Sequence, residues 1–154
     1  MKKTIFTLIL MFTVGMTASA QDSFAKQFKG KEGFSYITIG KAALKMMPQQ
    51  SRKNLKIGHI ADKVDRLEIV AASTPEAAYS LATACHNWIE NDGFDSVIDV
   101  DEVGQQASIY SKMGNDGNNI FLLLAHDQNQ ETSVIIIYGT MTLDDLQSGG
   151  GGNN

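Results

Sequence analysis

The chain has 154 residues, a formal net charge of −4 and a single cysteine, Cys85. This length suits one domain that buries roughly two-thirds of the surface of its unfolded chain, so folding needs neither a disulfide nor a metal. A lone cysteine excludes a disulfide within the chain, and an acidic balance without a basic stripe argues against nucleic acid or an anionic membrane surface as partner.

Residues 1–20 have the order of features of a secretory signal peptide. Lys2 and Lys3 form a basic start, an apolar run follows, and residues 18–20, Ala-Ser-Ala, are a small-residue cleavage site. The apolar run is shorter than the roughly 20 residues that a membrane-spanning helix needs. We therefore expect export to the periplasm or the medium, and no membrane anchor after cleavage. The mature protein would begin at Gln21 and carry 11 basic and 17 acidic residues, a net charge of −6.

We expect three parts in the chain. They are a signal peptide at 1–20, a single α+β domain at 21–147 and a disordered glycine-rich tail at 148–154. The tail holds four successive glycines, which cannot contribute to a packed core.

The first half of the domain alternates helical and strand patterns. Phe24 and Phe28 stand at helical spacing, which predicts a short helix that docks by these two side chains. Later segments are rich in aromatic and β-branched residues or alternate polar with apolar residues, as is typical of strands. The expected elements are this helix within 21–31, strands at 34–39 and 66–71, a short helix at 41–47 that ends at Pro48, a polar link at 49–54 and an undecided stretch at 55–64.

The clearest predicted element is a helix that follows Thr74. Thr74 suits the N-cap, Pro75 the first helical position, and Glu76 the positive end of the helix dipole. Gly93 is the expected left-handed residue at the end. Apolar residues recur at steps of three and four and form one stripe: Ala78, Leu81, Cys85, Trp88 and Ile89.

The C-terminal part is predicted to consist of strands joined by tight turns. The strands are expected at 94–100, 106–112, 120–125 and 133–138, with turns at 113–119 and 127–131. The last three strands should form an antiparallel meander, and Thr142 should cap a final turn at 143–146. The predicted fold class is α+β: a single antiparallel sheet of four to six strands with two main helices packed on one face.

Several of these segments, taken together, resemble a known family. After the signal peptide they are F-S-Y-I-T-I-G-K from Phe34, L-E-I-V from Leu67, S-I-Y-S-K from Ser108, I-F-L-L-L from Ile120 and V-I-I-I-Y-G-T-M from Val134. The chain resembles the bacterial domain-of-unknown-function family 4252, mostly short exported proteins, over about residues 24–147. The resemblance implies no activity and no functional residues. Some members look lipid-anchored, whereas this sequence has Gln21 rather than a cysteine directly after the cleavage site.

Cys85 and His86 have the residue types of a cysteine nucleophile and its histidine base. Cys85 belongs to the apolar stripe and should point into the core, whereas His86 is turned about 100° away on the helix. Because a buried thiol in apolar surroundings is inert, we expect Cys85 to fill the core. His59, His86 and His126 lack metal-ligand spacing and are interpreted as structural or surface residues.

One run of acidic residues could collect calcium: Asp95, Asp99, Asp101 and Glu102. Its spacing matches no calcium loop, and the apolar residues within and after it are interpreted as packing residues: Val97, Ile98, Val100 and Val103. The run is therefore interpreted as a solvated face. We expect no catalytic, cofactor-binding or metal-binding residues and no cofactor.

Two strands that are apolar at every position point most directly toward a function. Side chains alternate between the faces of a sheet, so Phe121, Leu123 and Ala125 share one face. Helices on one side cover only one face. The other must be covered by the N-terminal helix, by the turn at 143–146 or by another protein. In the last case Phe121, Leu123 and Ala125 form a partner surface.

Two functions of different classes follow. The first is a non-catalytic binding or interaction module of the bacterial cell envelope, which binds an unknown protein partner or a second copy of itself. The alternative is a small hydrolase or metal-dependent enzyme with a dispersed site. That alternative requires His126, Asp127 and the acidic run to meet in one cleft.

The signal peptide leads to a prediction about the mature N-terminus. Cleavage after Ala20 should leave a chain that begins at Gln21 and carries no lipid, because the cleavage site is followed by glutamine rather than cysteine. Intact-mass measurement and N-terminal sequencing of the protein from its native host check this. A chain that retains Met1, or one with an added acyl mass, would contradict it.

Overall fold

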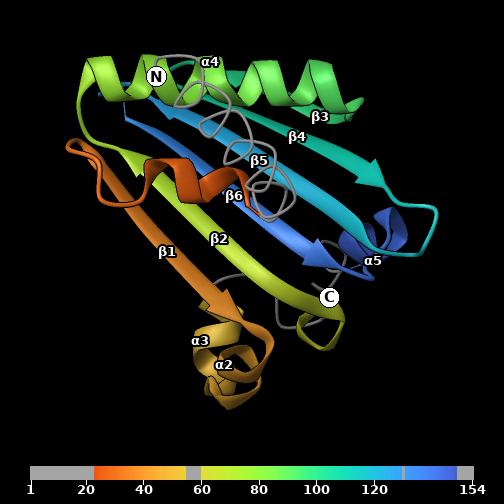
Figure 1. Cartoon of the computed structure of the whole chain (residues 1–154). Coiled ribbons are helices and arrows are strands. Elements are labelled where there is room, and N and C mark those ends of the chain that lie inside the picture. Colours follow the sequence, from red (N-terminus) through yellow and green to blue (C-terminus); the bar gives the residue numbers. More distant parts are fainter. Residues whose placement is uncertain (1–22, 55–59, 130, 149–154) are drawn as a thin grey trace, which may run out of the picture.

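The computed structural model describes residues 23–54, 60–129 and 131–148. These residues form a single antiparallel sheet with the strand order β1-β2-β6-β5-β4-β3 (Figure 1). The prediction of an α+β fold with one antiparallel sheet is confirmed, at six strands. The strands are β1 (Phe34–Gly40), β2 (Val64–Ala72), β3 (Asp95–Glu102), β4 (Gln105–Met113), β5 (Asn119–Asp127) and β6 (Thr132–Gly139).

The helical segments differ greatly in length. They are η1 (Phe24–Phe28), α2 (Lys41–Met46), α3 (Gln49–Asn54), η2 (Ala61–Lys63), α4 (Pro75–Asp92) and α5 (Leu143–Ser148). Only α4, with 18 residues, is long, so the expectation of two main helices on one face needs adjustment. The face that carries α4 is completed by the short η1, while α2 packs with a separate cluster on the other side of the sheet. Among the described residues, no helix combines the length and the apolar character needed to cross a membrane.

The limits of α4 follow from local chemistry, as the sequence predicts. The hydroxyl of Thr74 accepts a hydrogen bond from the backbone N–H of Ala77 at 3.2 Å, and Pro75 occupies the first turn. Gly93 ends the helix in the left-handed region, with φ 71° and ψ 44°, where a side chain would be strained. Helix α4 spans the distance from the end of β2 to the opposite edge of the sheet, where β3 begins (Figure 1).

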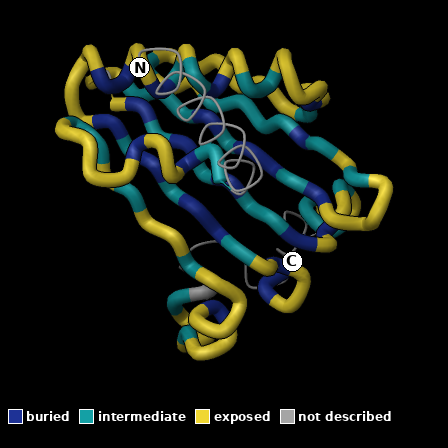
Figure 2. Tube along the Cα trace, viewed as in Figure 1, coloured by how far each residue is buried: buried dark blue, intermediate teal, exposed yellow. Residues whose placement is uncertain are grey.

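Helix α4 and η1 cover the same face of the sheet, which we call the helix face. Phe24 stacks on Trp88 of α4 with ring centroids 4.6 Å apart, and Phe28 contacts Phe34 of β1 at 4.9 Å. The predicted docking of the N-terminal helix by its two phenylalanines is therefore confirmed. Leu81 of α4 is fully buried in this layer, and the tube in Figure 2 shows the outward side of α4 exposed above mostly covered strands.

The antiparallel meander is confirmed and includes one more strand than expected, because β3, β4, β5 and β6 are neighbours in chain order. The predicted cap of the last helix is also present. The backbone N–H of Asp145 donates to the Thr142 hydroxyl at 3.4 Å. In return, the Asp145 carboxylate accepts a hydrogen bond from the backbone N–H of Thr142 at 2.8 Å. This reciprocal pair has the logic of a capping box.

The segment 49–54 differs from the prediction, since it forms α3 rather than a polar link. Its residues follow Pro48 and are mainly good helix formers such as Gln, Arg and Lys. The expected signal peptide at 1–20, part of the undecided stretch at 55–64 and the glycine tail lie outside the described residues.

Leu81 gives a test of the layer between α4 and the sheet. Leu81→Ala should lower the free energy of unfolding by about 2–5 kcal/mol, because it removes a fully buried side chain and leaves a cavity. Tyr79→Ala, on the same helix at 76% exposure, is the matched control and should change it by about 0.5 kcal/mol or less. Urea unfolding followed by circular dichroism measures both. Equal effects of the two substitutions would contradict this packing.

Candidate functional site

The sheet face opposite α4, which we call the open face, carries a continuous row of large aliphatic side chains. Each member is the register partner of the next across all six strands, so the row crosses the sheet at right angles to the strands. We call it the aliphatic row; from β1 to β3 it contains Ile37, Ile69, Ile135, Leu123, Ile109 and Ile98. Its end members Ile37 and Ile98 are 50% and 47% exposed. Its four middle members are partly exposed.

A second row of small side chains runs beside the aliphatic row. It is the next register row on the same face and contains Ser35, Ala71, Ser133, Ala125 and Ala107. These residues line a shallow hollow of about 540 Å³. The hollow is bordered toward the strand ends by polar residues such as Gln105, Asp127 and Glu131. Short side chains between larger neighbours explain why the surface is lowered here.

The third row of the open face is covered by the chain itself. Phe121 is 2% exposed and packs in a cluster with Leu44 of α2 and with Met141. Leu143 and Leu146 of α5 pack against the same cluster. An ion pair of 2.6 Å between Lys63 and Asp145 ties α5 to η2, directly before β2. The hydrogen bond from Lys63 holds the pKa of the Asp145 carboxyl below its usual value.

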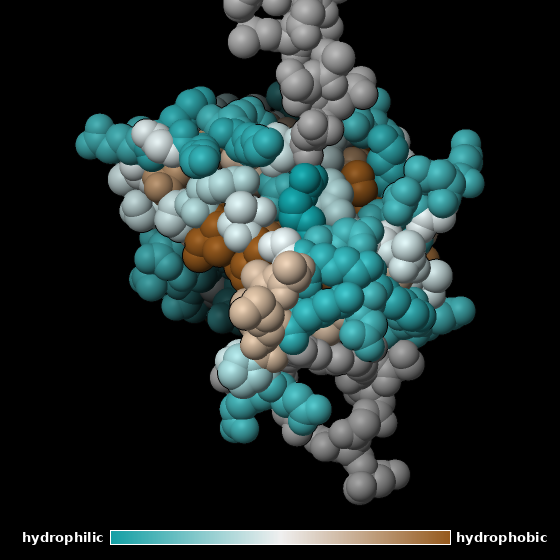
Figure 3. Space-filling model, turned by 60° about the horizontal axis from the view of Figure 1, so that its bottom comes forward, coloured by the Kyte–Doolittle hydropathy of each residue, from teal (hydrophilic) through white to brown (hydrophobic). Residues whose placement is uncertain are grey.

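The three residues of the predicted partner surface, Phe121, Leu123 and Ala125, do not all lie at the surface. All three lie on one face, but Phe121 belongs to the core beneath α5, whereas Leu123 and Ala125 lie in the two uncovered rows. The N-terminal helix, one expected source of cover, lies on the helix face instead. On the side shown in Figure 3, hydrophobic surface gathers mainly in one area among hydrophilic residues.

Of the four apolar residues interpreted as packing residues, Val97 is partly buried, whereas the other three are exposed and contradict that interpretation. Ile98 and Val100 are 47% and 41% exposed, and Val103 in the turn after β3 is fully exposed. The reason is position: β3 is an edge strand, so Ile98 and Val100 lie at the margin of the open face, which α4 does not cover. Their side chains extend the apolar surface to the edge.

Acidic residues gather at the end of the sheet where β3 ends and β4 begins. Asp101, Glu102, His126 and Asp127 border one hollow of about 440 Å³. Asp127 uses an oxygen to hold its turn, accepting from the backbone N–H of Asn129 and of Glu131, both at 2.9 Å. The end of the open face is therefore polar and negative, while its centre is apolar.

Cys85 and His86 belong to α4, away from the open face. His126 points to the helix face, where its Nδ1 lies 2.8 Å from the Thr132 hydroxyl, and burial, followed by the charge of His86, lowers its pKa. Burial raises the pKa of the Cys85 thiol to about 12. Within the described residues no three His, Cys, Asp or Glu side chains group as metal ligands; His59 lies outside them.

Sequence reasoning missed one buried polar cluster on the helix face. Glu68 is fully buried, accepts a hydrogen bond from the Ser23 hydroxyl and lies 2.8 Å from Nε of Arg66. The Arg66 guanidinium lies 4.2 Å from the ring centroid of Tyr138, whose pKa is raised to about 12 mainly by burial. Side chains alternate between the two faces along β2, so Arg66 and Glu68 share one face. This pattern is the signal in the sequence that could have revealed the cluster. The cluster links the start of η1 to the central strands.

A family model, that of a domain of unknown function (DUF4252), matches residues 28–148. The chain belongs to this family. The matched range contains all six strands and therefore both uncovered rows of the open face. The comparison with curated proteins gives no match.

Cys85 provides a test of the interpretation that it fills the core. A buried thiol whose pKa is raised to about 12 has almost no thiolate at neutral pH, so labelling of the folded protein by a thiol reagent should be very slow and should accelerate on unfolding in urea. Cys85→Ala should cost about 1 kcal/mol of stability. Rapid labelling without denaturant would show instead that the thiol is accessible.

Proposed function

We propose that this DUF4252 domain is a non-catalytic binding module of the bacterial cell envelope and that its open face binds a partner protein. The observation that carries the proposal is the aliphatic row, which continues unbroken across six strands and is only partly covered. A contiguous exposed apolar surface is costly in water and usually marks an interaction site.

The shape and charge of the face describe the partner. The small-residue row leaves a hollow of about 540 Å³ beside the aliphatic row, which can receive side chains that project from an apolar surface. The acidic end, with Asp127 and Glu131 at the border of the hollow, complements basic groups. We therefore propose a partner protein that presents an apolar patch flanked by lysine or arginine. Apolar contact would supply most of the affinity, and the charged rim would orient the partner.

The alternative of a hydrolase or metal-dependent enzyme has weaker support. His126, Asp127 and two members of the acidic run do border one hollow, as that alternative requires. However, Asp127 is engaged in its turn, and the hydroxyl beside the histidine Nδ1 belongs to Thr132, which is 2% exposed. A nucleophile must reach the substrate as well as its base, and the buried Thr132 hydroxyl does not.

Leu123 gives the test of the open face. An envelope extract should contain a saturable partner that the wild-type protein retains and that Leu123→Lys does not retain, because a charge in the aliphatic row must be desolvated on binding. Moderate salt should weaken retention, because the acidic rim contributes. Binding is measured by immobilising each purified variant, eluting, and titrating the recovered partner against the variant.

Tyr79→Lys on the outward side of α4 is the matched control, since it adds the same charge at a 76% exposed site away from the open face. It should retain the partner as the wild type does. Circular dichroism and urea unfolding of Leu123→Lys must show a folded protein. Equal retention by a folded Leu123→Lys variant, or loss in both variants, would refute the assignment to the open face.

A further inference from the structure

The two edges of the sheet are built differently. Strands β1 and β3 are at the ends of the strand order, so among the described residues no strand pairs with the outer side of either. Unpaired strand edges present backbone N–H and C=O groups that can accept another strand. Folded proteins usually protect such an edge with charges, bulges or covering segments.

Strand β3 has this protection and β1 lacks it. Strand β3 carries four carboxylates and an irregular register between Ser96 and Ile98. Strand β1 is the sequence Phe-Ser-Tyr-Ile-Thr-Ile-Gly, with no charge and no proline, and its seven residues pair with β2 in one unbroken register. An uncharged, regular edge of this length is suited to pairing with another strand.

We propose that β1 pairs antiparallel with β1 of a second copy of the chain, about a two-fold axis at Ile37. The axis stands perpendicular to the sheet, so the open faces of both copies lie on the same side. Centring on Ile37, the middle residue of β1, pairs all seven residues. It also places Ile37 opposite Ile37 of the second copy, so the two aliphatic rows become one. This proposal stands on the edge strand and does not depend on the proposed function.

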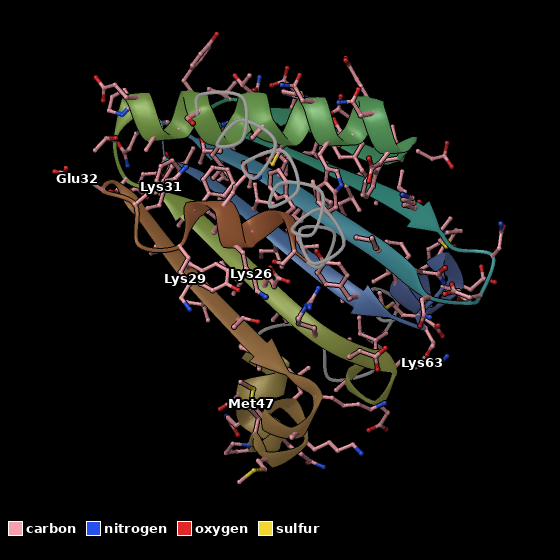
Figure 4. All side chains as sticks on the ribbon, in the orientation of Figure 1. Lys26, Lys29, Lys31, Glu32, Met47 and Lys63 are labelled. Atoms are coloured by element: carbon pink, nitrogen blue, oxygen red, sulfur yellow. The ribbon has the colours of Figure 1, made fainter. Side chains whose placement is uncertain are left out.

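The charges at the two ends of β1 favour the same arrangement. Glu32 lies in the turn before β1, at the outer tip visible in Figure 4, and Lys41 follows the last residue of β1. Antiparallel pairing centred on Ile37 brings Glu32 of each copy beside Lys41 of the other, which also pairs with Asp65 of its own chain at 3.3 Å. Each contact then joins one lysine to two carboxylates. Parallel pairing would place like charges together. Lys31 is turned toward its own chain, 6.0 Å from the Phe28 ring centroid.

The oligomeric state of the purified protein, expressed as the full chain and processed by the cell, tests the proposal. Analytical ultracentrifugation over a range of concentrations should give a dimer for the wild type. Ile37→Lys should lose the dimer, because two lysines would meet at the axis. Ile98→Lys is the matched control. Ile98 is also an isoleucine of the open face and is 47% exposed, close to the 50% of Ile37, but it lies on the opposite edge strand, β3. It should remain dimeric.

Crosslinking tests the geometry directly. In antiparallel strands, opposed Cα atoms are about 4.5–5.5 Å apart, which suits a disulfide. Ile37→Cys should therefore form a covalent dimer under mild oxidation and Ile98→Cys should not, while the buried Cys85 stays unreacted. A monomeric wild type would overturn the proposal. A dimer that persists in the Ile37→Lys variant would also overturn it. Equal loss of the dimer in the Ile98→Lys and Leu123→Lys variants would overturn it too, because that result indicates that two copies stack by their open faces.

Discussion

The central strands β6 and β5 are apolar on both faces, as is β2 apart from its charged residues Asp65, Arg66 and Glu68, and the described part of the chain supplies one long helix to cover them. This constraint determines the rest of the structure. The helix face receives α4 and η1 and becomes a closed layer, with Leu81 of α4 and Leu122 and Ile136 of the sheet fully buried. The open face receives only short segments at one end, where α2 and α5 pack around Phe121. The small-residue row and the aliphatic row remain partly exposed, and within the aliphatic row Ile69 and Ile135 also pack against the Phe121 cluster.

The short segments are held in place by polar contacts as well as by packing. On the helix face the Ser23 hydroxyl donates to the buried Glu68 carboxylate, which also pairs with Arg66. On the open face Lys63 pairs with Asp145 and so anchors α5. Burying a carboxylate costs free energy, and pairing it with Arg66 does little more than offset that cost. The role of the Glu68 cluster is therefore better explained as positioning the N-terminal segment than as adding stability. These contacts determine which part of each face is closed.

The geometry favours recognition by a surface over chemistry in a pocket. Its hollows are shallow, and the acidic residues and histidine at the end of the sheet are engaged in turns and local hydrogen bonds. The aliphatic row, by contrast, is extended and free of charge. The family match covers this surface, and it assigns the family without an activity. The proposed partner protein would contact side chains of the open face, and the proposed second copy would pair with the backbone edge of β1. The two surfaces meet at Ile37 and can be occupied together.

The sequence by itself determined the elements whose signals are local. Thr74, Pro75 and Gly93 specify both ends of α4 because capping and left-handed backbone depend on neighbouring residues only. Alternation placed Phe121, Leu123 and Ala125 on one face for the same reason. Whether that face is covered depends on where segments distant in sequence come to pack. Thus η1 joined α4, α5 buried Phe121, and β3 lay at an edge with Ile98 and Val100 exposed. The aliphatic row exists only through the register of six strands, and the unprotected edge of β1 only through strand order; both are properties of the tertiary structure.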